Sequence, residues 1–212
     1  MLRKNVYPLV EPLVLKIVRQ LNDQGISPNQ LTLGGLALTF LAGWIFAAGQ
    51  LFIGGLFLIL ASLGDMLDGP LARETKKVTK FGAFLDSTVD RYADFFIFVG
   101  LAIHYVRHTG TGWFLVVMGI LMGSFVTSYA KARAENLIKD CSVGYFGRAE
   151  RIVLVALGAL IPFLMPFLLW VLLIGTNATA IQRILYTRNA LLLPDQPGIS
   201  RPAQQDHEKR TL

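Results

Sequence analysis

Six apolar stretches, separated by short polar segments, run along most of the chain. Most of them approach the length of about 20 residues that an α-helix needs to cross the hydrocarbon core of a bilayer. The second and fifth stretches are shorter, so a crossing there must continue into neighbouring polar residues. The pattern predicts an all-α integral membrane protein with six transmembrane helices, at residues 31–50, 51–67, 81–102, 112–130, 152–162 and 165–185.

A further helical pattern precedes the first span. Lys16, Arg19 and Gln20 fall on a different side of the helical wheel from the apolar residues of this segment. The segment is predicted to be an N-terminal amphipathic juxtamembrane helix that lies on the membrane surface, packs against the cytosolic ends of the bundle, or does both. Its apolar stripe consists of Val10, Leu13, Val14, Ile17, Val18 and Leu21.

No internal repeat is evident, which counts against a transporter built from inverted repeats. We therefore expect one membrane domain over residues 1–190. It comprises the juxtamembrane helix at residues 1–26 and a six-helix bundle at residues 27–190, and a polar cytosolic tail follows at residues 191–212.

Composition and charge agree with a membrane protein and set its orientation. Hydrophobic residues make up 53% of the chain and charged residues 16%, with a mean hydropathy of +0.52; soluble domains carry about 25% charged residues. Of the 20 Lys and Arg residues, only Arg107 falls in a predicted outer loop and only Arg91 falls well inside a span. Because basic residues gather on the cytoplasmic side, we expect a multi-pass protein of the cell membrane with both termini on that side.

Four aspartates occur at the cytosolic ends of the second and third spans. Asp65 and Asp68 are three residues apart and Asp86 and Asp90 are four apart, so each pair shares one face of its helix. The short connection makes these helices antiparallel neighbours with their acidic ends on the same side. Unpaired carboxylates are costly near lipid, whereas Mg²⁺ and Mn²⁺ favour carboxylate oxygens. The spacing therefore predicts a metal site, and a pair of ions is a known way to hold a phosphoryl group under attack.

A simpler interpretation treats these acids as ordinary helix ends. In that case they would cap helices or pair with Arg73 or Arg91. For any single acid this is the more common situation. It does not explain four acids at this spacing across one hairpin, and the pattern therefore favours the metal site.

The acidic segment resembles the signature of the CDP-alcohol phosphatidyltransferase family. Every fixed position of that signature is present with the family's spacing. The resemblance implies an enzyme in which an alcohol attacks the phosphate next to the lipid of a CDP-lipid and releases CMP. The matching residues are Asp65-x-x-Asp68-Gly69-x-x-Ala72-Arg73, eight residues, and then Gly82-x-x-x-Asp86-x-x-x-Asp90.

The resemblance also implies roles for individual residues. Asp65, Asp68, Asp86 and Asp90 would be ligands for two Mg²⁺ or Mn²⁺ ions at each active site. Asp90 would also be the general base that takes the proton from the acceptor's hydroxyl. The residues implied to bind the CDP-lipid are Pro28, Asn29, Gln30, Leu31, Asp68, Gly69, Ala72, Arg73 and Thr79.

Two of these assignments have independent physical reasons. Gly69 lets phosphates approach the backbone because it has no Cβ, and Arg73 offers a planar fork of donors to phosphate. The segment that begins at Ser27 is also a typical helix start, with Ser27 at the N-cap, Pro28 at N1 and Gln30 at N3. That local role alone would explain Pro28 and Gln30.

A second group of residues bears on the acceptor alcohol. The pattern Tyr129-x-Lys131-Ala132-Arg133-Ala134-Glu135, Arg148-x-Glu150-Arg151 and Gln182-Arg183 resembles the phosphatidylinositol-phosphate synthase branch, although Ala149 stands where that branch often has proline. The acceptor in that branch is inositol 1-phosphate. A dianionic phosphate requires paired donors, whereas the same cations could also face lipid headgroups. The residues implied to bind the acceptor phosphate are Lys131, Arg133, Arg148, Arg151 and Arg183.

The expected function is transfer of a phosphatidyl group from CDP-diacylglycerol to inositol 1-phosphate, giving phosphatidylinositol phosphate and CMP. The nearest alternative is a phosphatidylglycerophosphate synthase that uses glycerol 3-phosphate, and a remote one is a cation transporter. The choices between diacylglycerol and archaeol donors, and between Mg²⁺ and Mn²⁺, stay open. Expected partners are the CDP-lipid, a phosphorylated polyol, membrane lipids and, from the resemblance, a second copy in a homodimer; no nucleic acid is expected.

Overall fold

The computed structural model describes residues 14–192 of the chain, and all regular structure within that range is helical. The predictions for residues 1–13, including Val10 and Leu13 of the apolar stripe, and for residues 193–212 of the tail lie outside it. A helical segment occupies residues 14–23. The elements that follow are α2 (Pro28–Ala47), α3 (Leu51–Glu74), α4 (Lys80–His108), α5 (Thr111–Ala134), α6 (Arg148–Leu160), the 3₁₀ turn η1 (Pro162–Leu164) and α7 (Met165–Leu192).

Each of the six predicted apolar stretches forms a helix. Four segments are long and apolar enough to cross a membrane, namely Pro28–Ala47, Leu51–Glu74, Thr111–Ala134 and Pro162–Leu192. Helix α4 has 29 residues but is less apolar, and α6 has only 13 residues. Over the described residues, an all-helical fold with four helices long and apolar enough to cross a membrane is therefore confirmed. The count of six spans stays a prediction.

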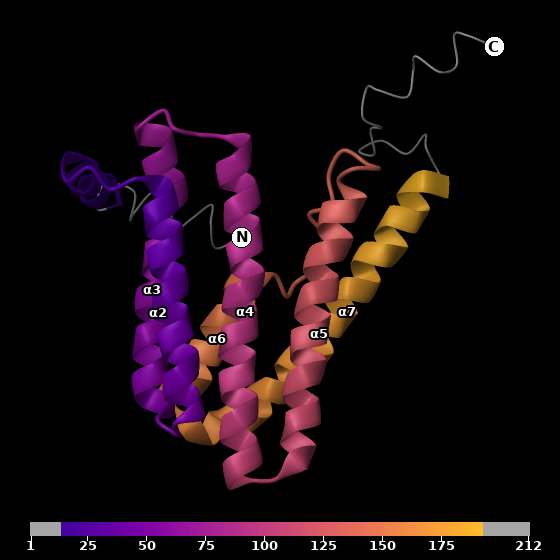
Figure 1. Cartoon of the computed structure of the whole chain (residues 1–212). Coiled ribbons are helices and arrows are strands. Elements are labelled where there is room, and N and C mark those ends of the chain that lie inside the picture. Colours follow the sequence, from indigo (N-terminus) through magenta and orange to yellow (C-terminus); the bar gives the residue numbers. More distant parts are fainter. Residues whose placement is uncertain (1–13, 193–212) are drawn as a thin grey trace. The chain divides into compact units, whose positions relative to one another are not determined.

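The chain divides into two compact units, Met1–His104 and Tyr105–Leu212. In the first unit, α2 and α3 pack side by side along their lengths (Figure 1). Helix α4 crosses α2 closely, because Gly43 lies against the backbone of Phe96 and Gly100 lies against the backbone of Gly43. A Cβ at either glycine would clash with those carbonyl groups. The two glycines thereby set the close approach of α4 to α2.

The start of α2 forms as its sequence predicts. Ser27 is the N-cap, Pro28 occupies N1, and Gln30 completes a capping box. The backbone N–H of Ser27 donates to Gln30 Oε1 at 2.8 Å, and the backbone N–H of Gln30 donates to Ser27 Oγ at 3.3 Å. These bonds satisfy two of the donors that every helix start leaves without helical partners.

Helix α3 continues beyond its apolar stretch to Glu74, so the whole acidic motif up to Arg73 is helical. It then ends in a Schellman turn: Lys77 N–H donates to Ala72 O at 2.9 Å and Lys76 N–H donates to Arg73 O at 3.2 Å. Lys76 takes the left-handed conformation, with φ of 55°, that this turn requires. The turn reverses the chain, and α4 therefore begins only a few residues after α3 ends.

The helical segment at residues 14–23 packs on α3. Val14 and Val18 are buried against Leu71, and Arg19 Nε lies 3.6 Å from Glu74 Oε1. These contacts agree with the predicted packing of this segment against the bundle. Its position on a membrane surface stays a prediction.

In the second unit, α5 and α7 pack together and α6 packs on α7. Polar groups join the first pair: Thr127 Oγ1 donates to Thr176 O at 2.9 Å, and Asn177 Nδ2 donates to Gly119 O at 3.3 Å. Lipid tails are as apolar as Leu side chains, so membrane helices associate through close packing and such hydrogen bonds. The α5–α7 interface has both features.

Candidate metal and nucleotide site

Three of the four predicted ligand aspartates converge in the first unit. Asp65 and Asp68 project from the last turns of α3, and Asp86 projects from the second turn of α4. Each offers one carboxylate oxygen, and the three oxygens lie within 4.8 Å of one another. All three side chains are half-buried. Three convergent carboxylates suit a hard divalent cation, and this donor set fits Mg²⁺ or Mn²⁺.

The carboxylate of Asp68 is oriented by a residue of another helix. Thr32 on α2 is buried, and its Oγ1 donates a hydrogen bond of 2.8 Å to Asp68 Oδ2. Thr32 did not figure among the residues predicted for the site. It lies one turn after Pro28 and Asn29, on the same face of α2, and that periodicity is the signal that could have found it.

Asp90 lies one turn beyond Asp86 on α4 and is not part of the group of three. Its Oδ2 lies 3.4 Å from Nη1 of Arg91, which also donates to Ser87 O at 2.7 Å. Its side chain is 17% exposed. Asp90 therefore has a half-buried carboxylate next to the triad in sequence, and its predicted roles as fourth ligand and general base stay predictions.

A pocket of about 310 Å³ opens beside the triad, between the start of α2, the end of α3 and the start of α4. Two triad members, Asp68 and Asp86, belong to its wall. Of the residues predicted to bind the CDP-lipid, seven line this pocket: Pro28, Asn29, Asp68, Gly69, Ala72, Arg73 and Thr79. Its lining also includes residues that the prediction lacked, namely Thr32, Lys77, Val78 and Ala83.

Two predicted nucleotide contacts are engaged elsewhere. Gln30 is held in the capping box of α2, and Leu31 packs against the apolar cluster of Val14, Val18 and Leu71. Neither lines the pocket as the structure describes it. Their role in binding the nucleotide, which the family resemblance implied, stays a prediction. The helix start alone accounts for the presence of Gln30.

Two glycines keep the pocket open. At Gly82, a Cβ would lie 3.1 Å from Thr79 Oγ1 and 3.6 Å from Asn29 Oδ1. Thr79 Oγ1 in turn accepts a hydrogen bond of 2.9 Å from the backbone N–H of Gly82, which caps the start of α4. At Gly69, an added Cβ would lie 3.6 Å from Nη1 of Arg73. The guanidinium of Arg73 therefore lies over the bare backbone of Gly69, where a phosphate could meet both.

The five cations predicted to bind the acceptor all belong to the second unit. Lys131 and Arg133, at the end of α5, are the more exposed pair, and Lys131 Nζ lies 3.7 Å from Glu135 Oε1. Arg151, in the first turn of α6, is 1% exposed, and Arg148 is half-buried. Arg151 and Arg183 are therefore buried, Lys131 and Arg148 are partly buried, and Arg133 is exposed.

Arg183 on α7 is 8% exposed and is held by backbone carbonyls. Its Nε donates to Val143 O at 3.0 Å and its Nη1 donates to Thr127 O at 2.7 Å. A guanidinium carries five N–H donors, so these bonds leave donors for an anion. The structure thus gives Arg183 a structural role that the sequence did not predict.

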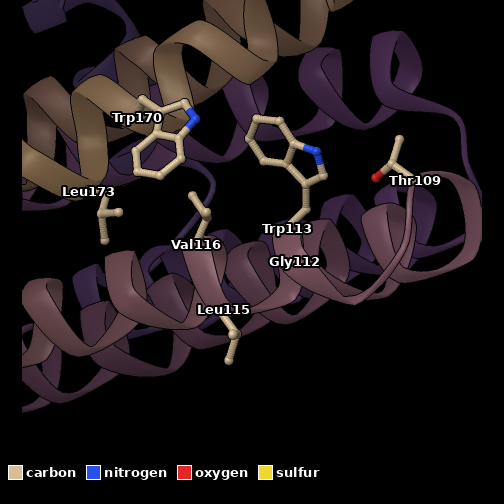
Figure 2. Close-up of a pocket in the computed structure, with 7 residues that line it drawn as sticks. All are labelled: Thr109, Gly112, Trp113, Leu115, Val116, Trp170 and Leu173. Atoms are coloured by element: carbon tan, nitrogen blue, oxygen red, sulfur yellow. The ribbon is translucent and has the colours of Figure 1, made fainter.

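A larger hollow of about 710 Å³ lies at the other end of α5 and α7. Figure 2 shows Trp113 and Trp170 next to each other in its wall; their ring centroids are 6.5 Å apart and their planes are inclined by 60°. Its seven lining residues are Thr109, Gly112, Trp113, Leu115, Val116, Trp170 and Leu173, and none carries a charge. Tryptophan is typical of the headgroup level of a membrane. This hollow lacks the groups that phosphoryl transfer needs, whereas the smaller pocket has them.

Comparison with known proteins agrees with this geometry. The model of the family described as CDP-alcohol phosphatidyltransferase matches residues 25–182. This chain belongs to the CDP-alcohol phosphatidyltransferase family. The predicted family is therefore confirmed, and with it the prediction of a transferase.

Members of this family with assigned activities are similar to the chain over most of its length. An archaetidylinositol phosphate synthase of Pyrococcus horikoshii is 35% identical over 88% of this chain and 96% of its own. A phosphatidylinositol phosphate synthase of Streptomyces avermitilis is 35% identical over 86% of this chain and 80% of its own.

A solved structure gives the same result. The phosphatidylinositol phosphate synthase of Mycobacterium tuberculosis with CDP-DAG bound has a TM-score of 0.78 and 31% identity, covering 91% of this chain and 99% of that one. Another structure of that enzyme, in complex with manganese and citrate, has a TM-score of 0.76 and 31% identity, covering 90% of this chain and 93% of that one. The prediction of a divalent-metal enzyme is thus supported by a relative with manganese and by the triad of this chain.

Proposed function

We propose that this protein transfers the phosphatidyl group of CDP-diacylglycerol to inositol 1-phosphate, forming phosphatidylinositol phosphate and CMP. The observation that carries the proposal is the convergence of Asp65, Asp68 and Asp86 beside a pocket that also presents Gly69 and Arg73. Further support comes from relatives named for phosphatidylinositol phosphate and archaetidylinositol phosphate synthesis.

The donor's diphosphate binds in the pocket beside the triad. Arg73 supplies a charged fork of donors, Gly69 lets a phosphate approach the backbone, and Asn29 and Thr79 offer neutral polar groups around the nucleotide. Lys77, also in the lining, adds positive charge. Positioning and charge neutralisation supply most of the catalysis in phosphoryl transfer, and these residues do both.

Asp65, Asp68, Asp86 and Asp90 hold two Mg²⁺ or Mn²⁺ ions, and Thr32 keeps the Asp68 carboxylate oriented. When bound, such ions neutralise the charge that develops on the phosphate oxygens. The four aspartates place the metal ligands in a half-buried site, and Asp90 also serves as the base. In that setting, electrostatic interactions are stronger than in water.

The chemical step is a substitution at the phosphorus that bears the diacylglycerol. The acceptor's hydroxyl oxygen forms a bond to that phosphorus, and the hydroxyl proton passes to the carboxylate of Asp90. The bond from that phosphorus to the oxygen bridging it to the CMP phosphate breaks, and CMP leaves with that oxygen. Asp90 suits the role of base because it has a half-buried carboxylate one turn from the ligand Asp86.

The acceptor's phosphate is bound by cations of the second unit, drawn from Lys131, Arg133, Arg148, Arg151 and Arg183. Support comes from Arg183, whose guanidinium carries five N–H donors and uses two of its nitrogens on Val143 O and Thr127 O. The donors that remain suit the charged oxygens of a phosphorylated acceptor better than the neutral hydroxyls of free inositol.

The protein works as a six-span enzyme of the cell membrane, with its amphipathic N-terminal segment, active site and both termini on the cytoplasmic side, and it forms a homodimer. The asymmetry of Lys and Arg supports the orientation. Cysteine-labelling of introduced sites at residues 77 and 110 in intact cells tests it. Reaction at residue 110 but not at residue 77 is the expected result, and the reverse would overturn the orientation.

A panel of acceptors tests the function directly. Purified protein is given CDP-diacylglycerol with Mn²⁺ or Mg²⁺ and, separately, inositol 1-phosphate, free inositol or glycerol 3-phosphate, and CMP release is measured. Release that depends on inositol 1-phosphate is expected. Release with glycerol 3-phosphate alone would instead identify a phosphatidylglycerophosphate synthase, the alternative that the same cations permit. Metal-dependent ion flux in liposomes, without CMP release, would favour a transporter.

A further inference from the structure

Three successive turns of α7 hold one short segment of the loop that precedes α6. Gly175, Thr179 and Arg183 are spaced four residues apart on α7, so they lie on one face of the helix. Each contacts the segment of residues 143–146. The contacts are of different kinds: a ring against bare backbone, a hydrogen bond to a hydroxyl, and a hydrogen bond from a guanidinium.

The first contact is the ring of Phe146 against Gly175. A Cβ at Gly175 would come within 2.6 Å of three carbons of that ring. The position therefore has to be glycine for the ring to lie where it does. A side chain there would push Phe146 away from α7.

The central contact is made by Thr179. Its Oγ1 accepts a hydrogen bond of 3.1 Å from the backbone N–H of Phe146. Its side chain also lies directly against Gly144, whose φ of 104° favours glycine. Thr179 is 1% exposed, so its hydroxyl is shielded from water, and an amide left without this acceptor would be costly.

The last contact comes from Arg183, whose Nε donates to Val143 O at 3.0 Å. The segment held in this way leads through Gly147 into α6, where Arg148 is the first residue and Arg151 lies in the first turn. Gly147 provides no side-chain cap for α6. The position of Arg148 therefore depends on how the preceding segment is held.

We propose that Thr179 is a positioning residue for binding of the acceptor. By holding residues 143–146 against α7, it fixes where Arg148 lies at the start of α6. This inference rests on the proposed function, because Arg148 and Arg151 are there assigned to the acceptor's phosphate. Thr179 contacts neither substrate in this proposal. It affects the binding of only one of them, the acceptor.

The test compares Thr179→Val, which keeps the shape and removes the hydroxyl, with Thr179→Ser, which keeps the hydroxyl. The matched control is Thr187→Val, two turns along the same helix, where the hydroxyl donates to Arg183 O within α7 at 2.8 Å. Purified variants are assayed for CMP release while inositol 1-phosphate and CDP-diacylglycerol are varied in turn. Hydrogen exchange of the Phe146 amide is followed in the same preparations.

Thr179→Val is expected to raise the KM for inositol 1-phosphate about three- to tenfold, the range that loss of one buried hydrogen bond produces. The KM for CDP-diacylglycerol should change less than about twofold, and the Phe146 amide should exchange faster. Thr179→Ser and Thr187→Val should both keep the acceptor KM and the Phe146 amide exchange rate of the unaltered protein. An equal rise in both KM values, an unchanged acceptor KM, or failure of Ser to restore it would overturn the inference.

Failure of the proposed function would look different. If the unaltered protein releases no CMP with inositol 1-phosphate, the acceptor assignment is wrong whatever the variants do. The same comparison is then made with glycerol 3-phosphate, whose phosphate requires the same cations. A selective rise in its KM in Thr179→Val would support the positioning role, and no selective rise would overturn it.

Discussion

The hydroxyl of Thr32 on α2 donates a 2.8 Å hydrogen bond to Oδ2 of Asp68 on α3. This bond connects the helix that begins at the pocket with a carboxylate of the metal site. It leaves Asp68 Oδ1 as the oxygen with more freedom to approach a cation. A metal ligand held in this way is already oriented before the metal arrives, and partners of this kind affect metal affinity strongly.

Thr32→Val is therefore expected to weaken Mn²⁺ binding about 10- to 100-fold. The substitution keeps the side chain's shape and removes the donor to Asp68. Mn²⁺ titration followed by electron paramagnetic resonance measures the affinity without turnover. The Mn²⁺ dependence of CMP release gives a second reading on the same protein.

The control for Thr32 is Thr39→Val on the same helix. Thr39 is buried as well, but its hydroxyl donates to Gly35 O within α2, at 2.8 Å. The Mn²⁺ affinity of Thr39→Val should match that of the unaltered protein, and Thr32→Ser should retain most of that affinity. Equal Mn²⁺ affinities in Thr32→Val and Thr39→Val would show that the hydrogen bond does not support the metal site.

Asp90→Asn is expected to lower the rate of CMP release by a factor of about 10² to 10⁴, the usual contribution of a general base. The amide keeps the shape of the side chain but cannot take the acceptor's proton. CMP release is measured at saturating Mn²⁺ and CDP-diacylglycerol, and size-exclusion chromatography in detergent checks that the variant folds.

The carboxylate control for Asp90 is Glu74→Gln, at the exposed end of α3. Glu74 pairs with Arg19 at 3.6 Å, and exposed pairs contribute about 0–1 kcal/mol. The rate of CMP release by Glu74→Gln should stay within about twofold of that of the unaltered protein. Substantial CMP release by Asp90→Asn would remove Asp90 from the role of base.

The acidic site shows which features of the structure can be predicted from the sequence. Spacing alone predicted that Asp65 and Asp68 share a face and that Asp86 meets them across a short turn, and the structure brings these three together. The helix start at Ser27 was also predictable, because its hydrogen bonds join residues three apart. Such features depend on local periodicity, which the sequence carries directly.

Other features depend on how helices pack, and the sequence does not carry them so directly. The bond from Thr32 to Asp68 joins residues 36 positions apart, and the bond from Arg183 to Thr127 O joins residues 56 apart. The apolar stretch at residues 51–67 was predicted to continue into polar residues, but its hydropathy did not show where the helix ends; α3 continues to Glu74. Hydropathy describes contact with lipid, and helix length follows from hydrogen bonds and the final turn.

Gly82→Ala is expected to raise the KM for CDP-diacylglycerol at least about fivefold, since overpacking by one methyl group costs about 1–3 kcal/mol. The added Cβ would lie 3.1 Å from Thr79 Oγ1 and 3.6 Å from Asn29 Oδ1, so it would crowd two residues of the pocket wall. The KM for the acceptor should change less. Steady-state kinetics with each substrate varied in turn measure both values.

The control for Gly82 is Gly34→Ala, since a Cβ at Gly34 meets no atom within 4 Å. Alanine in a helix interior is favoured over glycine by about 1 kcal/mol, so this variant should be at least as stable and equally active. An unchanged donor KM in Gly82→Ala would mean that the pocket tolerates the methyl group and that donor binding does not depend on this opening.

The α5–α7 interface gives a prediction of stability. Gly123 is buried in α5, and a Cβ there would lie 2.5 Å from Thr176 Oγ1 and 2.8 Å from Asn177 Nδ2. Gly123→Ala must displace these side chains, including the amide that donates to Gly119 O. We expect it to lower the free energy of unfolding by about 1–3 kcal/mol, measured by thermal unfolding in detergent.

The control is Gly112→Ala on the same helix. An added Cβ at Gly112 meets no neighbouring atom within 4 Å, so this variant should leave the unfolding transition unchanged. Equal stability of the two variants would mean that α5 and α7 are not held by this close polar contact.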